Sequence, residues 1–180
     1  MHVLQQPIEK IDRPVELIRD VHPRDARPIL EIYTPIVEST AISLEADPPT
    51  QREMTERLGQ VEPRWPWLVM QGPGRLFGFA CASQFQACDA YRYSAQTQVY
   101  VHPDDRGEGV GRMLMEALLQ RLRSAGHHMA IASITLPNPA AVALHESLGF
   151  EQVGMFREVG RKFFAWHDVG YWALDLEVPG

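Results

Sequence analysis

The sequence predicts an α/β domain of the α+β kind, in which one mixed sheet is flanked by helices. Short runs rich in β-branched and aromatic residues alternate with longer segments of helical periodicity. The chain has 180 residues, a length typical of one domain, and 45% of them are hydrophobic, enough for a sizeable core. No repeat or low-complexity segment interrupts this pattern. We therefore expect a polar lead-in at residues 1–14 and a single domain at 15–180.

The first expected elements are a strand and a helix. Residues 15–19 (VELIR) alternate between apolar and polar side chains, as a half-buried strand does. Apolar residues then recur at helical intervals from 29 to 37. Pro28 and Pro35 are expected to bend or end this helix, because proline lacks the amide hydrogen and clashes with the preceding turn.

The middle of the chain predicts a second helix and three strands. Thr50 opens the helix, since Glu53, three residues later, completes a capping box. Strands at 67–70 and 76–85 flank a Gly-Pro-Gly turn and predict a hairpin. A further strand is expected at 93–103.

The second half of the chain alternates helices with strands. Apolar residues from 110 to 122 lie on one helical stripe, and the helix is expected to end near Gly126. Residues 129–135 (MAIASIT) predict a buried strand, and residues 138–150 predict a short helix. The last two strands are expected at 152–159 and 167–176.

Composition excludes several classes of function. Seventeen Lys and Arg stand against 23 Asp and Glu, and no basic run is present, so we expect no nucleic-acid partner. No stretch of about 18 apolar residues and no signal-peptide core occur, so we expect a cytoplasmic protein with no membrane partner. Cys81 and Cys88 form no CxxC pair and have no clustered histidines. We therefore expect no metal site and two buried free thiols.

Three glycines, at positions 107, 109 and 111, separate an expected strand from an expected helix. Their G-x-G-x-G spacing differs from the G-x-G-x-x-G of dinucleotide-binding folds, and no Lys-Ser/Thr pair follows, as a Walker loop requires. The remaining interpretation is that free amides at a helix start bind an anion such as a pyrophosphate. A tight turn without a ligand is the alternative, in which each glycine would cost up to about 1 kcal/mol of chain entropy.

The segment Arg106–Gly111 resembles the R/Q-x-x-G-x-G/A loop of the GNAT N-acetyltransferase superfamily. The second signature of that superfamily, N-x-x-A-x-x-x-Y/H-x-x-L-G-F/Y, is matched by Asn138, Ala141, His145 and Leu148-Gly149-Phe150. The runs PWLV, AYRYSAQTQVYV, LPNP and WHDVGYWALDL are similar to the phosphinothricin acetyltransferase group within the superfamily. The resemblance covers about residues 15–176.

The resemblance implies a GNAT fold, with a mostly antiparallel twisted sheet flanked by helices and two splayed central strands. It implies an acetyl-CoA-dependent N-acetyltransferase that acts on the amino group of a small amino-acid-like substrate, of the phosphinothricin or methionine sulfone or sulfoximine type. It also implies a homodimer. A catalytically weak acyl-CoA-binding domain and a protein N-terminal acetyltransferase are the alternatives.

The resemblance also assigns residues to acetyl-CoA. The main chain of Val99, Tyr100 and Val101 is expected to hold the pantetheine arm. The pyrophosphate is expected at Arg106, Gly107, Glu108, Gly109, Val110, Gly111 and Arg112. Glu108 stands where the family often has a basic residue, and its carboxylate about 6 Å from a phosphate would cost roughly 0.7 kcal/mol. Asn138 either contacts the cofactor arm or only caps its helix.

Two residues are candidates for catalysis. His145, with an ordinary pKa near 6.5, is implied to donate a proton or hydrogen bond toward the departing thiol. A hydrogen-bonded helix histidine without a catalytic role is the alternative. Gln96 stands where the resembled group usually has a glutamate base, and glutamine cannot take a proton. Because an α-amino group of pKa about 8 is roughly one-tenth neutral at pH 7, a slower reaction remains open.

Substrate contacts are the least specified part of the site. Basic residues common before Tyr91 in the resembled group are absent here, so Arg92 is the nearby candidate for binding a carboxylate. Lys162 and Phe163, between the last two strands, are expected either at a wall of the amine pocket or at a dimer interface. His167 and Asp168 are adjacent in a strand, face opposite ways and are interpreted as structural. The expected substrate residues are therefore Tyr91, Arg92, Lys162 and Phe163.

Overall fold

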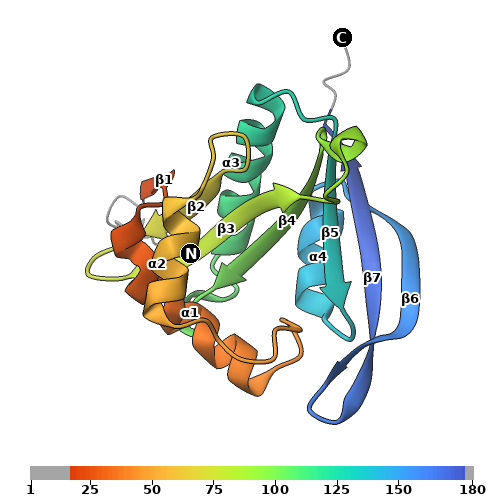
Figure 1. Ribbon diagram of the computed structural model, residues 1–180, viewed down its shortest axis with the longest axis horizontal. Helices are drawn as coiled ribbons and strands as arrows, with labels where there is room; N and C mark the ends of the chain where they lie inside the picture. The colour runs from red at the N-terminus through yellow and green to blue at the C-terminus, as the bar shows by residue number, and fades with distance from the viewer. Residues whose placement is uncertain (1–16, 177–180) are drawn as a thin grey trace, which may run out of the picture.

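A seven-stranded sheet runs through the centre of the protein, and helices cover both of its faces (Figure 1). The structure is a computed structural model that describes residues 17–176. The polar lead-in expected at residues 1–14 lies outside the described residues. The strands are β1 (Leu17–Asp20), β2 (Trp67–Gln71), β3 (Leu76–Gln84), β4 (Ser94–Val101), β5 (Met129–Thr135), β6 (Glu151–Lys162) and β7 (Ala165–Asp175). The helices are α1 (Ala26–Ser39), α2 (Gln51–Gly59), α3 (Val110–Ser124) and α4 (Pro139–Ser147), with 3-10 turns η1 (Pro23–Asp25), η2 (Asp89–Tyr91) and η3 (Pro103–Asp105).

The strand order is β1-β2-β3-β4-β5-β7-β6, and all neighbours are antiparallel except β4 and β5. These two strands are parallel and pair only along Ser94–Gln96 and Met129–Ile131. Beyond Gln96 they diverge, as Figure 1 shows. The predicted mixed sheet with splayed central strands is confirmed. The divergence leaves the main chain of residues 97–101 without a strand partner on the β5 side.

Two apolar clusters, one on each face of the sheet, hold the helices in place. On one face α3 buries Leu114 and Leu118 completely. On the other face Ile32 of α1 and Met54 of α2 are buried against a cluster that includes Tyr100 of β4. Each such side chain stabilises the fold by about 1.5–3 kcal/mol relative to its exposed state. Apolar packing on both faces of the sheet therefore holds strand β4, which carries expected cofactor residues, in place.

Neither proline ends the first helix, so that part of the prediction is wrong. Helix α1 runs from Ala26 to Ser39 with Pro35 inside it. Pro28 lies in the first turn, where an amide hydrogen would have no intrahelical acceptor. Pro35 removes one internal hydrogen bond, but Ile32 and Ile36 on the same stripe are buried. Tertiary packing of that stripe outweighs the local preference.

Local capping signals are confirmed. The Thr50 side chain accepts a hydrogen bond from the amide of Glu53, and the Glu53 carboxylate accepts one from the amide of Thr50. Boundaries shift at several strands. The first described strand extends to Asp20, and β6 continues to Lys162, beyond the expected end at 159. Strand β4 ends at Val101 rather than at 103, and β7 begins at Ala165 rather than at 167.

The two cysteines differ in their surroundings. Cys81 is buried as expected, whereas Cys88 lies in the exposed loop before η2, so the prediction of two buried thiols is wrong for Cys88. Within residues 17–176, no helix combines the length and apolar character needed to cross a bilayer. In the same part of the chain, no group of three His, Cys, Asp or Glu residues is placed to share a metal ion.

Candidate active site

The glycine turn lies between β4 and α3. The 3-10 turn η3, which precedes it, is held by an ion pair. Arg75 donates from both terminal guanidinium nitrogens to the Asp105 carboxylate at the end of η3. Gly107 and Gly109 have φ angles of +82° and +84°, in the left-handed region that residues with a Cβ avoid. A Cβ at either position would meet nothing within 4 Å. The backbone conformation, rather than crowding, therefore requires these two glycines.

The turn leaves the first amides of α3 ahead of the helical hydrogen-bond ladder. The amide of Met113 donates to the Gly109 carbonyl at 3.0 Å and closes the first turn. The amides of residues 110–112 precede that bond at the positive end of the helix dipole, a position that favours an anion. The charged side chains of this segment, Arg106, Glu108 and Arg112, are exposed.

A cavity of about 250 Å³ opens where β4 and β5 part. Its walls are residues 97–100 of β4 and 132–135 of β5. Residues 42–45, in the loop between α1 and α2, line the cavity as well. Helix α4 contributes Asn138, Ala141 and His145.

Several residues expected to bind the cofactor meet at this cavity. Val99, Tyr100 and Asn138 line it, whereas the side chain of Val101 packs against the α3 cluster. The Asn138 side-chain oxygen also accepts a hydrogen bond from the amide of Ala141 at 3.2 Å. Asn138 is therefore the cap of α4 and a wall residue at once, so the two roles considered for it are compatible.

His145 is buried on the cavity wall, and one of its ring nitrogens is engaged. Nδ1 lies 2.8 Å from the carbonyl oxygen of Ala141. Because a carbonyl only accepts, Nδ1 carries the hydrogen, and Nε2 of the neutral ring bears a lone pair. Nε2 is buried and has no hydrogen-bond partner among the described residues. Burial lowers the pKa of His145, against the effect of the bond to Ala141, so the neutral ring is favoured at pH 7.

Gln96 lies at the last residue pair between β4 and β5. Its side-chain nitrogen donates to the hydroxyl of Ser133 on β5 at 3.0 Å. The cavity lining begins one residue later on β4, at Thr97. The Gln96 side chain thus links β4 to β5 by a hydrogen bond at the last residue pair before the strands diverge. An amide side chain does not accept a proton at neutral pH.

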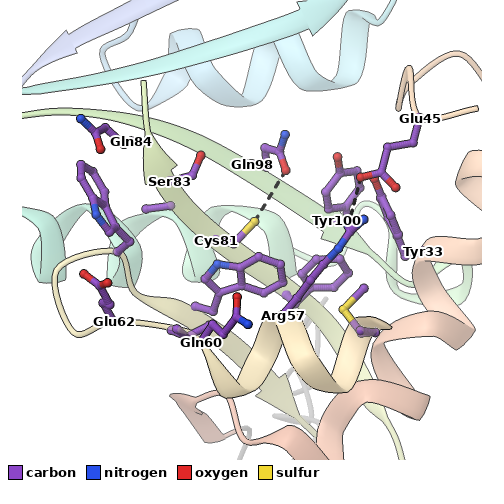
Figure 2. A pocket seen from close by; sticks show the side chains of 16 residues that line it. Tyr33, Glu45, Arg57, Gln60, Glu62, Cys81, Ser83, Gln84, Gln98 and Tyr100 are labelled. Atoms are coloured by element: carbon purple, nitrogen blue, oxygen red, sulfur yellow. Dashed lines mark hydrogen bonds and ion pairs between the residues drawn. The ribbon is translucent and has the colours of Figure 1, made fainter. Parts of the chain in front are cut away.

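A larger cavity of about 390 Å³ adjoins the first one on the side of α1 and α2. Glu45 and Arg57 lie near one end of it, close to Tyr33 and Tyr100, and Ser83 and Gln84 lie toward the other end (Figure 2). The two cavities share four lining residues: Tyr33, Glu45, Gln98 and Tyr100. The two cavities are therefore adjacent, with these four residues at their common boundary.

Cys81 lines the larger cavity but is not a nucleophile. Burial raises the pKa of its thiol to about 12. The sulfur donates to the side-chain oxygen of Gln98 at 3.7 Å. At neutral pH the thiol stays protonated and unreactive.

The residues expected near the substrate lie outside both cavities. Tyr91 packs on Phe85 in the exposed η2 region, and Arg92 forms an ion pair with Asp89 at 2.8 Å. Neither Tyr91 nor Arg92 lines a described cavity. Phe163 is half-exposed near the tip of the β6–β7 hairpin.

Lys162 is buried and holds a loop rather than facing either cavity. Its ammonium nitrogen donates to the carbonyl oxygens of Val37 and Ser43, each at 2.7 Å. His167 and Asp168 also bind the main chain of this hairpin, His167 to the Lys162 carbonyl and Asp168 to the Glu158 amide. These contacts agree with a structural interpretation of the His-Asp pair.

Comparison with known proteins identifies the architecture. Residues 18–170 match the family of acetyltransferase (GNAT) domains. The chain belongs to the GNAT acetyltransferase family. This GNAT enzyme is 35% identical over 167 residues to a phosphinothricin N-acetyltransferase of Streptomyces viridochromogenes, covering 93% of this chain and 91% of the relative.

Two further relatives are similar along most of their length. The chain is 34% identical over 164 residues to an L-methionine sulfoximine/L-methionine sulfone acetyltransferase of Salmonella typhimurium, with 89% of this chain and 94% of the relative covered. Its fold matches the crystal structure of a phosphinothricin acetyltransferase from Sinorhizobium meliloti in complex with AcCoA, with a TM-score of 0.84 and 32% identity. That match covers 89% of this chain and 88% of the other. The family resemblance expected from the sequence is confirmed.

Sequence reasoning missed Glu45 and Arg57. Arg57 lies in the last turn of the amphipathic helix α2, and Glu45 lies in the loop before that helix. Their separation of 12 residues follows no helical or strand period. Only tertiary packing brings Glu45, which lines both cavities, next to Arg57, which lines the larger one.

Proposed function

We propose that this GNAT enzyme transfers the acetyl group of acetyl-CoA to the amino group of a small amino-acid-like substrate, of the phosphinothricin or methionine sulfone or sulfoximine type. The observation that carries the proposal is the buried, unpartnered Nε2 of His145 on the wall of the cavity between β4 and β5. The relatives named for those substrates support the substrate class. The related structure that holds AcCoA supports the acetyl donor.

The residues present fit acetyl-CoA. The amides of residues 110–112 would bind the pyrophosphate, each charge-assisted hydrogen bond contributing about 1.5–3 kcal/mol. The main chain of residues 97–101 has no strand partner on the β5 side and would bind the pantetheine arm. The exposed position of Glu108 keeps its repulsion of a phosphate weak. When bound, acetyl-CoA supplies an acetyl group activated as a thioester.

The chemistry requires two protons to leave the substrate nitrogen. An ammonium carries three protons, and the product amide keeps one. Loss of the first proton frees the lone pair, which attacks the acetyl carbonyl carbon. The second proton leaves as the C–N bond forms and the C–S bond breaks, with the electron pair of the C–S bond remaining on sulfur. One proton ends on the thiolate sulfur and the other in solvent.

In this scheme His145 first accepts a proton and then donates it. Its neutral Nε2 can take a proton from the nitrogen and pass it to the thiolate sulfur. The proton-donor role implied by the family resemblance thus becomes the second half of the cycle. A positioned general base typically contributes about 10²- to 10⁴-fold in rate.

We also propose that the enzyme is a cytoplasmic homodimer. Strand β6 is an edge of the sheet, and the β6–β7 hairpin extends beyond the other strands (Figure 1). Large apolar side chains are exposed on the hairpin: Val153, Phe156, Val159, Phe163, Phe164 and Trp166. A second copy that covers them would remove this apolar surface from water. Sedimentation equilibrium at micromolar concentration tests the dimer, and a monomer would contradict it.

The proposed activity is tested by measuring free thiol release. Purified protein is incubated with acetyl-CoA and a panel of phosphinothricin, L-methionine sulfone, other amino acids, simple amines and short peptides, while calorimetry measures binding of CoA. Release with free amino acids is expected. CoA binding without any release would favour an acyl-CoA-binding domain, and release with peptides alone would favour a protein N-terminal acetyltransferase. Absence of CoA binding would overturn the proposal.

A further inference from the structure

We infer that Glu45 and Arg57 form a receptor for the two charges of a free α-amino acid, with Glu45 binding the ammonium group and Arg57 binding the carboxylate. The inference rests on the acetyl transfer proposed above and specifies how this chain selects its amine. It explains how the enzyme binds a carboxylate although Arg92, the basic residue nearest to Tyr91, is paired with Asp89 outside the cavities.

The positions of Glu45 and Arg57 relative to the two cavities define how an amino acid would be oriented between them. Nη1 of Arg57 lies 3.1 Å from Oε1 of Glu45, and both residues line the larger cavity. Glu45 also lines the cavity between β4 and β5, which contains His145, whereas Arg57 does not. An amino acid bound to both residues would therefore place its nitrogen toward His145 and its carboxylate away from it.

Arg57 is the only cation that lines the larger cavity in the described part of the chain. The described residues provide one hydrogen-bond partner for its side chain, Glu45, contacted through Nη1. Its planar fork has five N–H donors, so others remain for a substrate carboxylate. The side chains of Arg57 and Glu45 are 45% and 38% exposed, and an ion pair of that exposure is worth only about 0–1 kcal/mol. Rearrangement of the pair around a substrate is therefore inexpensive.

The loop that carries Glu45 is held by contacts with two elements, β6 and α1, and by a hydrogen bond within the loop. Lys162 of β6 donates to the Ser43 carbonyl, and the Ser43 hydroxyl lies 2.9 Å from the hydroxyl of Tyr33 in α1. The Glu45 amide donates to the same Ser43 hydroxyl at 3.3 Å. Leu44 lies so close to β6 that a Cβ on Gly160 would be 2.6 Å from it. The Glu45 carboxylate therefore projects from an anchored loop.

The charged and titratable groups around Glu45 come from four elements. Arg57 of α2 pairs with it directly. Burial raises the pKa of Tyr33 in α1 and of Tyr100 in β4, and the charge of Glu45 contributes to both shifts. Burial lowers the pKa of Lys162 in β6, and Glu45 opposes that shift. The negative charge of Glu45 thus favours the protonated form of its neighbours, and it would stabilise a bound ammonium group in the same way.

The remainder of the larger cavity is lined by aromatic rings, polar side chains and the Glu62 carboxylate, and it has room for a substrate side chain of moderate size. Trp65, Trp67 and Phe79 supply aromatic surface, and Ser83 and Gln84 lie toward the end away from Arg57 (Figure 2). A sulfone or similar polar group at the end of a short aliphatic stem would find hydroxyl and amide donors there.

The test compares L-methionine sulfone with its primary amide, which keeps the amino group and lacks the carboxylate. Calorimetric titration of each into the protein–CoA complex measures affinity without turnover, and thiol release gives kcat/KM. For Arg57→Gln we expect affinity and kcat/KM to fall about 10- to 100-fold for the acid and less than twofold for the amide. For Glu45→Gln we expect a similar fall for both compounds.

Matched controls lie on the same helix. Arg52 and Glu56 form an exposed ion pair on α2 and line neither cavity, so Arg52→Gln and Glu56→Gln should leave both compounds unchanged. Equal loss of acid and amide in Arg57→Gln, or no loss of either, would overturn the inference. If the unmodified enzyme acetylates no amine, the proposed function fails, whereas the difference in affinity between acid and amide still decides the role of Arg57.

Discussion

Nδ1 of His145 lies 2.8 Å from the carbonyl oxygen of Ala141, one helical turn earlier on α4. This contact selects the tautomer in which Nδ1 carries the hydrogen and Nε2 keeps the lone pair of a proton acceptor. The wall of the pocket between β4 and β5 therefore includes a neutral imidazole with a lone pair on Nε2, whereas the side chain of Gln96 has no basic nitrogen.

Replacement of His145 by Asn is expected to lower kcat about 10²- to 10⁴-fold. The Asn amide can still donate toward the Ala141 carbonyl but has no nitrogen at the Nε2 position. Because acetyl-CoA is proposed to bind mainly through the main chain of residues 97–101 and the amides of residues 110–112, its Kd should change less than threefold, as measured by calorimetry. Unchanged turnover would remove His145 from the mechanism.

Stability should fall at acidic pH because of His145. Its folded pKa is below the ordinary value of 6.5, so the unfolded chain binds more protons between the two values. The free energy of unfolding contributed by the neutral ring is complete above pH 6.5 and is lost as the pH falls from 6.5 through the folded pKa. Urea titrations between about pH 5 and 8 should show a steeper decline for the unmodified enzyme than for His145→Asn. Parallel curves would contradict this.

Substitution of Gly109 by Ala is expected to weaken acetyl-CoA binding about tenfold or more. A Cβ strains the left-handed backbone by about 1–2 kcal/mol and shifts the amides that precede α3. Gly74→Ala is the control, because Gly74 has a φ of +78° and equally open surroundings but lies in the β2–β3 turn. Both variants should lose similar stability, and calorimetry should detect weaker binding in Gly109→Ala alone.

Gln96→Glu is expected to raise kcat at neutral pH severalfold. The carboxylate would add a second base and could accept the hydrogen bond of the Ser133 hydroxyl in place of the present contact. Gln152→Glu, which adds the same charge at an exposed position of β6, should have no effect. A slower Gln96→Glu enzyme would show that this vertex requires an uncharged side chain.

Lys162→Met should loosen the loop that carries Glu45. Two buried carbonyls would lose their donor, which costs about 1–3 kcal/mol and lowers Tm by several degrees. The KM for the amine should rise more than the Kd for acetyl-CoA. Arg161→Met, a neighbouring exposed change, should alter neither quantity. Equal effects on both ligands would argue against a role of this loop in amine binding.

Features encoded by short segments could be predicted from the sequence. The capping box at Thr50, the cap at Asn138 and the helix after the glycine turn depend on residues within one or two turns of each other. The two family signatures are also local, and they led to the GNAT fold before any tertiary contact was considered. Strand limits and the continuity of α1 through Pro35 were less predictable, because packing of a buried stripe competes with local preference.

The sequence by itself determined the family, the order of the elements and the residues of the glycine turn. Only the tertiary structure decided that His145 is buried on a cavity wall, that Lys162 binds Ser43 from 119 residues away, and that Glu45 pairs with Arg57. Those contacts depend on strand order, on the divergence of β4 and β5 and on the packing of a loop over them. The spacing of residues along the chain does not predict these long-range contacts, because they form only when separate elements pack around a common core.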